Sequence, residues 1–310
     1  MPYANAGRAM MQLAATRIGW GVPAQFDATV HSLFRSVAIL AARDQRLVTL
    51  APSATGGLPG AISVNLPDDF DFRTALRQGS GAALRGGVLR LEHGAVAVDL
   101  RHARRWRSRL AELGLDLAAA GPRRAWEVAA AGLAADGRSD AFAAIAHRPI
   151  RALFEAASAL NAMAARRAMA KLVGLGAGGT PAGDDFLVGF ISGLRATQSR
   201  TQPVRITFSA SLGKALQPLL DRTNDVSRVY LAAAAAGEVS ERLADLASAI
   251  AGGASAAPLG EAAKAAIAVG HTSGADCTLG LLLGAAAWGP EAIVRRAMSL
   301  IDGSLLRVTA

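Results

Sequence analysis

The segment KLVGLGAGGTPAGDDFLVGFISGL, residues Lys171–Leu194, decides how the C-terminal part of the chain folds. Its first half places four glycines within six residues, Gly174, Gly176, Gly178 and Gly179. Glycine adopts positive φ without steric cost, so this density predicts a loop whose backbone can approach a ligand closely. The second half is an apolar run that predicts a buried helix.

This helix is expected to begin at Thr180 and Pro181, because threonine is a good N-cap and proline fits the first helical position. Asp184 and Asp185 then lie in the first turn, where the helix dipole favours negative charge. A glycine loop followed by exposed helix N–H groups is also a typical anion site. The segment is thus compatible with an anion site, a metal site or a tight turn alone.

A second segment, Gly270–Gly284, reads GHTSGADCTLGLLLG and repeats the form G-x-D-x-x-x-G-x-x-x-G. Each copy has an acid in the first helical turn and two glycines four residues apart on one face. A glycine inside a helix costs up to ~1 kcal/mol relative to alanine, so two such pairs need a packing reason. We expect the two helices to contact each other along their glycine faces. The corresponding positions are Gly183, Asp185, Gly189 and Gly193 in the first copy and Gly274, Asp276, Gly280 and Gly284 in the second.

If both helices start at the same end, their acids and hydroxyls converge into one composite site. The alternative is two capped helices whose acids merely satisfy their own N–H groups. Glycine-rich loops in both copies favour the site, because capping alone does not require them. The candidate catalytic residues are Asp185, His271 and Asp276. The candidate substrate-binding residues are Gly176, Gly178, Thr180, Gly183, Asp184, Thr272, Ser273, Gly274, Asn224 and Arg228.

The two adjacent acids are expected to have different roles, because neighbouring helical residues point about 100° apart. Asp185 is aligned with Asp276 and is therefore expected to face inward, while Asp184 caps the helix or forms a salt bridge. A dedicated metal site would need more ligands, and the sequence has no cluster of histidines and cysteines. We therefore expect no metal and no other cofactor.

The remaining polar groups each have two interpretations. His271 is either a general acid or base or a structural loop residue. Cys277 lies in the first turn of its helix, where a thiolate is favoured, but a buried inert thiol is the preferred interpretation. Asn224 and Arg228 share a helix face suited to a carboxylate or phosphate, unless Arg228 pairs with Asp225 on the surface.

The composition indicates a globular protein, with 52% hydrophobic and 18% charged residues in a chain of 310. No apolar run reaches the ~18 residues of a membrane span, and the N-terminal segment lacks the pattern of a secretion signal. The single cysteine fits a reducing compartment, so we expect a cytoplasmic protein without a membrane partner. The net charge of +9 and the arginine patch RHARRWRSR, Arg101–Arg109, raise the question of nucleic acid. No nucleic-acid motif accompanies the patch, so a small anionic substrate or an acidic partner is preferred.

The order of these patterns predicts an α+β protein with a small N-terminal, mostly-β module before a larger Ala/Gly-rich, all-helical domain. Residues 1–27 are expected to be a helical or mobile lead-in, residues 28–100 the β-rich module, and residues 101–310 the helical domain with both glycine motifs. Strand signals are hairpins at 37–50 and 88–100 and a strand at 61–66. Helices are expected at 102–113, 122–135, 138–146, 149–172, 184–197, 209–220, 223–236, 239–251, 259–269 and 276–287, with a polar loop at 199–205.

The two glycine segments resemble the signatures of the AllH family. LVGLGAGGTPAGDDFLVGF is similar to the family run GLGPGLTPSGDDFLAG, and GHTSGADCTLG is similar to its G-H-S/T-S-G-x-D run. DRTNDVSRVYLAAAAAGEVSE resembles a third signature, and HSLF and GLPG resemble weaker N-terminal marks, so that the resemblance covers about residues 28–290. Ala177, Gly179 and Ala182 stand where the family has proline, leucine and serine. The missing serine removes a hydroxyl from the loop, so the substrate could differ.

This resemblance implies a bacterial subunit of oxamate carbamoyltransferase in allantoin and purine degradation, acting beside an FdrA-like subunit and other partners. The reaction moves a carbamoyl group between oxalurate and phosphate, giving oxamate and carbamoyl phosphate. The expected ligand is therefore a small anion of the carbamoyl phosphate, oxamate or oxalurate class. The alternatives are a non-catalytic scaffold or regulatory subunit of such a complex, and a carboxylase-like protein. Assembly as a homo-oligomer is also open.

Overall fold

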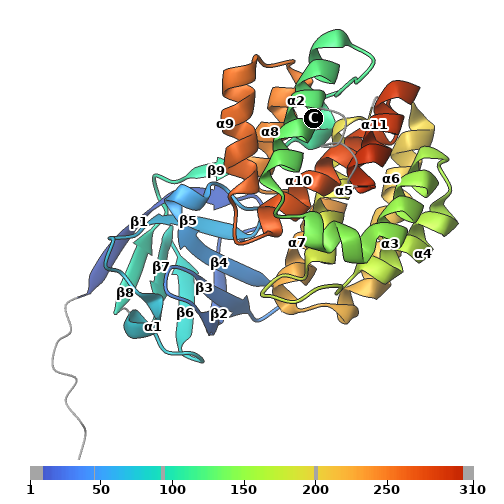
Figure 1. Ribbon diagram of the computed structural model, residues 1–310. Helices are drawn as coiled ribbons and strands as arrows, with labels where there is room; N and C mark the ends of the chain where they lie inside the picture. Colours follow the sequence, from blue (N-terminus) through green and yellow to red (C-terminus); the bar gives the residue numbers. More distant parts are fainter. Residues whose placement is uncertain (1–9, 45, 92–94, 199–201, 303–310) are drawn as a thin grey trace, which may run out of the picture. The chain divides into compact units, whose positions relative to one another are not determined.

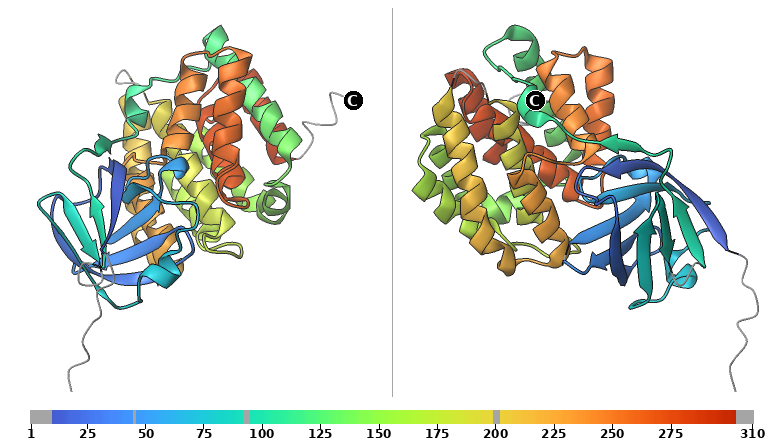
Figure 2. Two further views of the ribbon diagram at one scale, coloured as in Figure 1. Left: turned by 90° about the vertical axis from the view of Figure 1, so that its left-hand side faces the viewer. Right: turned by 180° about the vertical axis from the view of Figure 1, so that it is seen from behind.

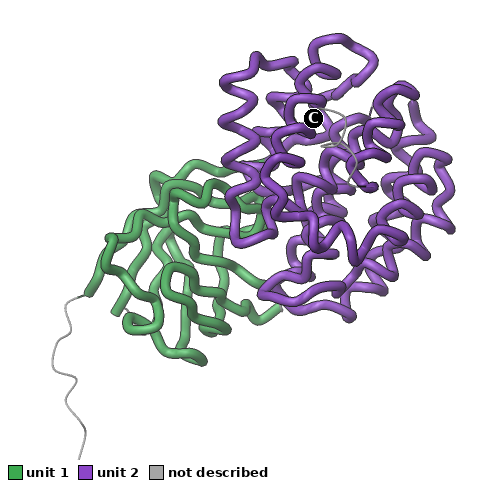
Figure 3. The backbone as a smooth tube through the Cα atoms, in the orientation of Figure 1, with its two compact units in different colours: residues 1–107 green, residues 108–310 purple. Residues whose placement is uncertain are grey.

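The computed structural model describes residues 10–44, 46–91, 95–198 and 202–302. The chain divides into two compact units, Met1–Arg107 and Ser108–Ala310 (Figure 3). The first unit is built almost wholly from strands and the second from helices (Figure 1). The predicted α+β class is therefore confirmed.

The first unit is a sheet that closes on itself. Its strands follow the order β5-β4-β3-β2-β6-β7-β8-β1, and a further pairing of β5 with β1 completes the ring. A short strand, β9, adds to β1 in parallel. The strands are β1 (Met11–Gly19), β2 (Phe26–Leu33), β3 (Ala38–Ala42), β4 (Leu47–Pro52), β5 (Ala61–Asn65), β6 (Gly81–Arg85), β7 (Val88–Leu91), β8 (Val96–Asp99) and β9 (Arg104–Trp106).

The strands of the first unit curve around one another (Figure 2), and alternate side chains of these strands fill the interior of the closed sheet. Val30, Leu40, Leu50, Ile62 and Val98 are almost completely buried there. These residues are mostly β-branched or leucine, the types that pack well on a pleated surface. The first unit therefore has a hydrophobic core of its own.

Both predicted hairpins and the strand at 61–66 are confirmed. β3 pairs with β4 and β7 pairs with β8, each antiparallel, while β5 lies within the predicted strand range. The predicted turns include Gln45 and residues 92–94, which lie outside the described residues.

The predicted lead-in was wrong for Met11–Gly19, which forms β1, and β2 also begins before residue 28. A bulge between Ala15 and Arg17 interrupts the alternation of buried and exposed side chains, so the period of two that identifies a strand is broken. The expected helix at 102–113 was also wrong. Arg104–Trp106 pairs with β1, and the buried Trp106 ring lies so close to Gly57 that an added Cβ there would be 2.7 Å from it.

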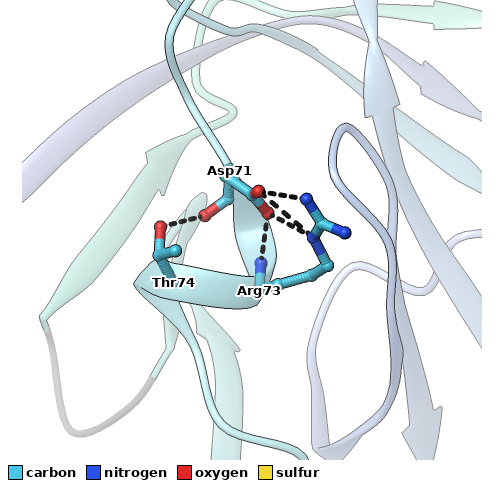
Figure 4. Close-up of polar contacts among 3 residues, drawn as sticks. All are labelled: Asp71, Arg73 and Thr74. Atoms are coloured by element: carbon cyan, nitrogen blue, oxygen red, sulfur yellow. Dashed lines mark hydrogen bonds and ion pairs between the residues drawn. The ribbon is translucent and has the colours of Figure 1, made fainter.

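Short aspartate–arginine pairs stabilise several turns. In each pair the aspartate accepts the backbone N–H two residues later, and the arginine at that position turns back to the same carboxylate. Asp71 shows the pattern before helix α1 (Phe72–Ala75), where it also accepts the Thr74 hydroxyl through its backbone carbonyl (Figure 4). The arginine lowers the pKa of each aspartate, and these pairs occupy part of the arginine excess. The pairs are Asp44–Arg46, Asp71–Arg73, Asp99–Arg101 and Asp136–Arg138.

The second unit is a helical bundle arranged around two central helices, α5 (Ala182–Ala196) and α10 (Ser273–Ala286) (Figures 1 and 2). Nearly every residue of these two helices is buried, as expected for runs that are apolar on all sides. The surrounding helices are α2 (Ala120–Asp136), α3 (Asp140–Ser158), α4 (Ala162–Leu172), α6 (Pro203–Leu216), α7 (Asp225–Ala235), α8 (Glu241–Ala251), α9 (Ala256–Ile267) and α11 (Glu291–Ile301). Short 3₁₀ turns occur at Leu110–Glu112 and Gln217–Arg222.

The predicted helices are shifted by a few residues at most of their ends, and the larger differences concern α3, α4, α6 and α11. The single helix predicted at 149–172 is interrupted at residues 159–161, between α3 and α4. α3 continues through Pro149, where the sequence suggested a break; Pro149 and Ile145 lie outside the buried face, where water can satisfy the carbonyl that proline leaves unpaired. α6 begins at Pro203, inside the predicted polar loop, because proline is well suited to the first helical position. α11 was not predicted at all.

The glycines of α5 allow the backbone of α10 to come into direct contact. A Cβ added to Gly189 would lie 1.9 Å from the carbonyl oxygen of Cys277, and one added to Gly193 would lie 2.3 Å from that of Leu281. No side chain larger than hydrogen fits at these distances. The close approach also places carbonyl oxygens against glycine Cα–H groups, as in tightly packed helix pairs.

The glycines of α10 make the reciprocal contact. A Cβ added to Gly280 would lie 2.0 Å from the carbonyl oxygen of Phe186, and one added to Gly284 would lie 2.1 Å from that of Phe190. The predicted contact along the glycine faces is therefore confirmed. The contacts advance in the same direction along both helices, so α5 and α10 are parallel and begin at the same end.

The repeat extends to the helices that precede each copy. A Cβ added to Gly183 would lie 2.1 Å from the carbonyl oxygen of Leu172 in α4, and one added to Gly274 would lie 2.2 Å from that of Ala266 in α9. Each of the three matched glycine pairs in the motif therefore has the same structural role in both copies. Within the described chain, no helix is long and apolar enough to cross a membrane.

We expect Gly280→Ala to lower the free energy of unfolding of the helical unit by ~1–3 kcal/mol, because the new methyl group would overlap the Phe186 carbonyl. Urea denaturation followed by circular dichroism in the helical band measures this loss. Gly260→Ala in α9 is the matched control, since no heavy atom lies within 4 Å of the added Cβ and alanine favours the helix by up to ~1 kcal/mol. Equal stability of the two variants would contradict the packing role of Gly280.

Candidate functional site

The joint start of α5 and α10 brings together acids and hydroxyls from both glycine segments. The Thr180 hydroxyl donates to the Asp185 carboxylate at 2.8 Å, and the Thr180 and Ser273 hydroxyl oxygens are 3.0 Å apart. When Asp185 is ionised, Thr180 must donate to it, so Ser273 donates to Thr180 in turn. This short chain of hydrogen bonds links the beginning of α10 to the acid of α5.

Asp276 lies deeper and is fully buried, whereas Asp185 is 7% exposed. Among the described residues, neither carboxylate oxygen of Asp276 has a hydrogen-bond partner. A buried polar group without a partner loses the hydrogen bonds it had in water, and this loss is larger for a charge. Asp276 is therefore the costliest polar group at the helix start, and its ionised form is disfavoured.

Both acids have raised pKa values. Burial raises the pKa of Asp185 to about 6, with a further contribution from the charge of Asp184, while the Thr180 and Ser273 hydroxyls lower it. Burial raises the pKa of Asp276 to about 7; the charge of Asp185 adds to the shift, and the neighbouring Thr272 hydroxyl partly offsets it. The two carboxyls therefore interact and titrate near neutral pH.

Asp184 was expected to cap α5 or to form a salt bridge while Asp185 faced inward; in the structure both acids are buried, and Asp184 points to the glycine loop. Its carboxylate accepts the Gly174 backbone N–H at 2.8 Å and also accepts the Thr223 hydroxyl. Because it is almost completely buried, these bonds hold the loop and the segment before α7 to the start of α5. We therefore interpret Asp184 as a residue that shapes the loop, with no direct contact to a ligand required.

The start of α5 differs by one residue from the prediction. Pro181 is the N-cap and Ala182 the first helical residue, so Thr180 precedes the helix and does not cap it. The Thr180 hydroxyl is used instead in the bond to Asp185. In α10, Thr272 is the N-cap residue, but its side chain makes no capping bond.

The glycine loop adopts backbone conformations that other residues rarely take. Gly174, Gly176 and Gly178 have φ values of 75°, 111° and 117°. Asn224 fastens the loop from the α7 side, because its side-chain amide donates to the Gly179 carbonyl at 3.0 Å while its oxygen caps α7. The predicted freedom of the glycine backbone is thus used to shape a turn.

The structure does not bring all candidate residues to the acid pair. His271 is exposed, and the described residues make no hydrogen bond or ion pair with its ring. Arg228 lies 3.7 Å from both Asp221 and Asp225, as in the surface-pairing alternative. The packing of Gly183 and Gly274 against neighbouring helices explains those glycines without a ligand.

Tyr230 of α7 is a further site residue that the motifs did not identify. Burial raises the pKa of Tyr230 to about 12, and the charges of Asp185 and Cys277 add to the shift. Burial also raises the pKa of the Cys277 thiol, with contributions from Asp185 and Asp276. Both groups are therefore neutral near pH 7, and both interact electrostatically with the acid pair. The only sequence signal for Tyr230 is its place in the third family-like segment.

The composition of the site suits proton transfer and hydrogen bonding to a small ligand. Among the described residues, no group of three or more histidine, cysteine, aspartate or glutamate side chains could hold a metal ion. The helix starts supply positive dipole ends that favour an anion, while the acids supply acceptors for N–H groups. A ligand with both an anionic group and an amide matches this combination.

Comparison with known families identifies both units. The family model described as oxamate carbamoyltransferase subunit AllH matches residues 172–285, and the model described as the AllH family N-terminal domain matches residues 6–105. The first range contains both glycine segments, and the second contains the closed sheet. No curated protein and no solved structure matches the chain.

We expect the free energy of unfolding of Asp276→Asn to increase, relative to that of the original chain, as the pH rises. The pKa of Asp276 is higher in the folded chain, about 7, than its ordinary 3.8. Its contribution to stability is therefore full below about pH 4 and is lost as the pH rises towards 7. The unfolding free energy of the variant relative to the original chain should rise by about 1–3 kcal/mol from pH 5 to pH 8.

Urea denaturation at the two pH values measures this difference. Glu261→Gln, which changes an exposed acid of α9, is the control and should show a much smaller change. If Asp276→Asn behaves like this control, Asp276 is not a buried acid in the folded chain.

Proposed function

Because the chain belongs to the AllH family, we propose that it is an oxamate carbamoyltransferase subunit whose substrate site is the joint start of α5 and α10. The family description as a subunit implies partner subunits. The observation that carries the choice of site is the buried, unpartnered carboxyl of Asp276 beside Asp185 and the two linked hydroxyls. A protein keeps such a costly arrangement where chemistry requires it.

The ligand class follows from the groups present. Oxamate carries a carboxylate beside a primary amide, and oxalurate carries a carboxylate beside a ureide. The positive ends of the two helix dipoles suit the anionic part of each molecule, whereas carboxyl and hydroxyl oxygens suit the N–H groups. Carbamoyl phosphate has the same pairing of an anion with an amide. The proposed site therefore uses one set of groups for all three molecules.

Catalysis at this site would depend on positioning and on stabilisation of charge. Fixed backbone contacts between α5 and α10 hold Asp185, Thr180 and Ser273 in one arrangement, so little reorganisation accompanies the reaction. Cys277 is not suited to be a nucleophile, because burial and its acidic neighbours keep the thiol protonated. The proposed transfer therefore proceeds directly between the two bound substrates.

The scaffold alternative attributes the glycine helices to an interface with partner subunits. The glycine faces of α5 and α10 are occupied by each other, so they offer no surface for a partner. A scaffold role would need another surface. The following experiment distinguishes a scaffold role from catalysis at the proposed site.

We expect oxamate and carbamoyl phosphate to raise the melting temperature of the chain assembled with its partner subunits by a few degrees. At a ligand concentration of ~100 Kd the stabilisation is ~2.7 kcal/mol. Asp185→Ala should assemble normally but lose this shift and at least ~100-fold of the carbamoyl transfer rate, because it removes the acid proposed to meet the substrate. Differential scanning calorimetry and an assay of carbamoyl phosphate formation from oxalurate and phosphate measure both.

Glu261→Gln is the control for assembly, ligand shift and rate. Full transfer activity in Asp185→Ala, in a complex that requires this chain, would instead support the scaffold role. Absence of any ligand shift in the original complex would contradict the proposed site.

A further inference from the structure

The acid pair carries no compensating positive charge. Burial, hydroxyl groups and other acids account for the pKa values of Asp185 and Asp276, and no lysine, arginine or histidine of the described chain contributes to them. Two ionised carboxylates in this environment would repel each other and would also repel an anionic substrate. One of the two must therefore stay neutral for the site to bind an anion.

The fold prevents the two acids from separating. Asp185 precedes Phe186, whose carbonyl oxygen would lie 2.0 Å from a Cβ on Gly280. Asp276 precedes Cys277, whose carbonyl oxygen would lie 1.9 Å from a Cβ on Gly189. Each acid is thus attached to the backbone at a point of direct contact between the helices. Mutual repulsion cannot be relieved by moving the helices apart without losing that contact.

The two carboxyls differ in their surroundings. Asp185 is slightly exposed and receives the Thr180 hydroxyl, which stabilises its ionised form. Asp276 is completely enclosed, and its oxygens have no hydrogen-bond partner among the described residues; the nearby Thr272 hydroxyl offsets the effect of burial only in part, so the neutral form is favoured. The difference in hydrogen bonding places the charge on Asp185 and the proton on Asp276.

We propose that Asp185 and Asp276 hold a single proton between them, with Asp185 as the general base towards the substrate nitrogen and Asp276 as a positioning residue that keeps the site singly charged. This inference rests on the proposed function and adds which acid of the pair is ionised and which is protonated. The geometry that carries it lies at the joined starts of α5 and α10: Asp276 is enclosed and its oxygens have no hydrogen-bond partner among the described residues, whereas Asp185 is hydrogen-bonded and keeps 7% of its surface exposed.

The step assigned to Asp185 is a proton transfer during carbamoyl transfer to oxamate. The oxamate nitrogen attacks the carbamoyl carbon of carbamoyl phosphate and forms a C–N bond. The C–O bond to phosphate breaks, and phosphate leaves with the electron pair. The nitrogen releases one proton to the Asp185 carboxylate, and the same group returns a proton to this nitrogen in the reverse direction. Amide nitrogen is a weak nucleophile, so a positioned base contributes ~10²–10⁴-fold.

Other titratable groups on three helices, α5, α10 and α7, interact electrostatically with the pair. Asp184 lies next to Asp185 on α5, Cys277 lies next to Asp276 on α10, and Tyr230 reaches both Asp185 and Cys277 from α7. α9 brings backbone carbonyl groups of Ala266 and Ile267 against the first turn of α10. Cys277 and Tyr230 remain neutral across the relevant range, so the acid pair dominates the pH response between about pH 5 and pH 8.

The pH dependence of transfer to oxamate tests the proposal. In the original complex, kcat/KM should fall tenfold per unit below about pH 6, as Asp185 becomes protonated, and again above about pH 7, as Asp276 ionises. The alkaline fall should lie mainly in KM, because the second negative charge repels the anionic substrates. The side chain introduced by Asp276→Asn cannot ionise. This variant should therefore keep the fall in kcat/KM below about pH 6, the acid limb, and lose the fall above about pH 7, the alkaline limb. Asp185→Asn should lose ~100-fold or more at every pH.

Thr278→Val is the matched control for a buried change in α10, because the Thr278 hydroxyl only bonds to the Gly274 carbonyl within its own helix. Its pH profile should keep both limbs. If Asp276→Asn keeps the alkaline limb, the proposed role of Asp276 is wrong. The proposed function would still hold in that case, because the complex would still transfer the carbamoyl group.

A second measurement is independent of activity. Carbon-13 NMR of aspartate side chains in the full chain should show two carboxyls that titrate near neutral pH. Asp276→Asn should remove the upper titration, and Asp185→Asn should lower the remaining one, because the charge of Asp185 contributes to the pKa of Asp276. Ordinary aspartate titration at both positions would overturn the proton-sharing pair even if oxamate transfer were confirmed.

Discussion

The direct backbone contact between α5 and α10 is the constraint on which the helical unit depends. Glycine at four positions lets carbonyl oxygens of one helix reach the Cα atoms of the other. Each glycine lowers the stability of its helix by up to ~1 kcal/mol relative to alanine, so packing at the contact must stabilise the helix pair by more than this. It also fixes the two helices as parallel, and the acids in their first turns are therefore held at one end. Surrounding helices are attached to this pair, as when the Trp126 indole of α2 donates to the Leu282 carbonyl at 2.9 Å.

The same constraint explains why the site lowers the stability of the fold. Asp184, Asp185 and Asp276 are all buried, although carboxylates are rarely enclosed without a positive partner. Asp184 is compensated by the loop N–H and the Thr223 hydroxyl, so its burial stabilises a local structure. Within the described chain the Asp276 oxygens have no such hydrogen bonds, and the Thr272 hydroxyl offsets the burial only in part. Asp184 thus fits a structural role, whereas Asp276 is explained by chemistry that needs a buried acid.

The sequence was informative where one local rule controls the structure. The spacing G-x-D-x-x-x-G-x-x-x-G predicted the helix contact because no residue but glycine fits such distances. The hairpins were predicted because β3 with β4 and β7 with β8 are neighbours in both sequence and space. β1 was missed since its bulge breaks the alternation and its partners, β5, β8 and β9, are distant in sequence.

The candidate site shows the same limit. The matched spacing was enough to align Asp185 with Asp276. The bond between Asp184 and Gly174 depends on the path of a glycine loop, and the approach of Tyr230 depends on how α7 packs, so neither could be read from a motif. His271 was selected for its chemical type, but its ring lies outside the hydrogen-bonded group.

The charge of the helix start decides between interpretations of its chemistry. Two helix N-termini together present roughly one positive elementary charge, which suits one carboxylate or one bound anion. Two ionised aspartates would cancel this field and leave an excess of negative charge before any anionic ligand arrives. With one proton on Asp276, the dipoles and the Thr180 hydroxyl balance the remaining charge on Asp185, so no excess of negative charge is left to repel an anion. A neutral enclosed acid beside an ionised, hydrogen-bonded one therefore satisfies both the electrostatics of the fold and the binding of a substrate that carries a carboxylate and an amide.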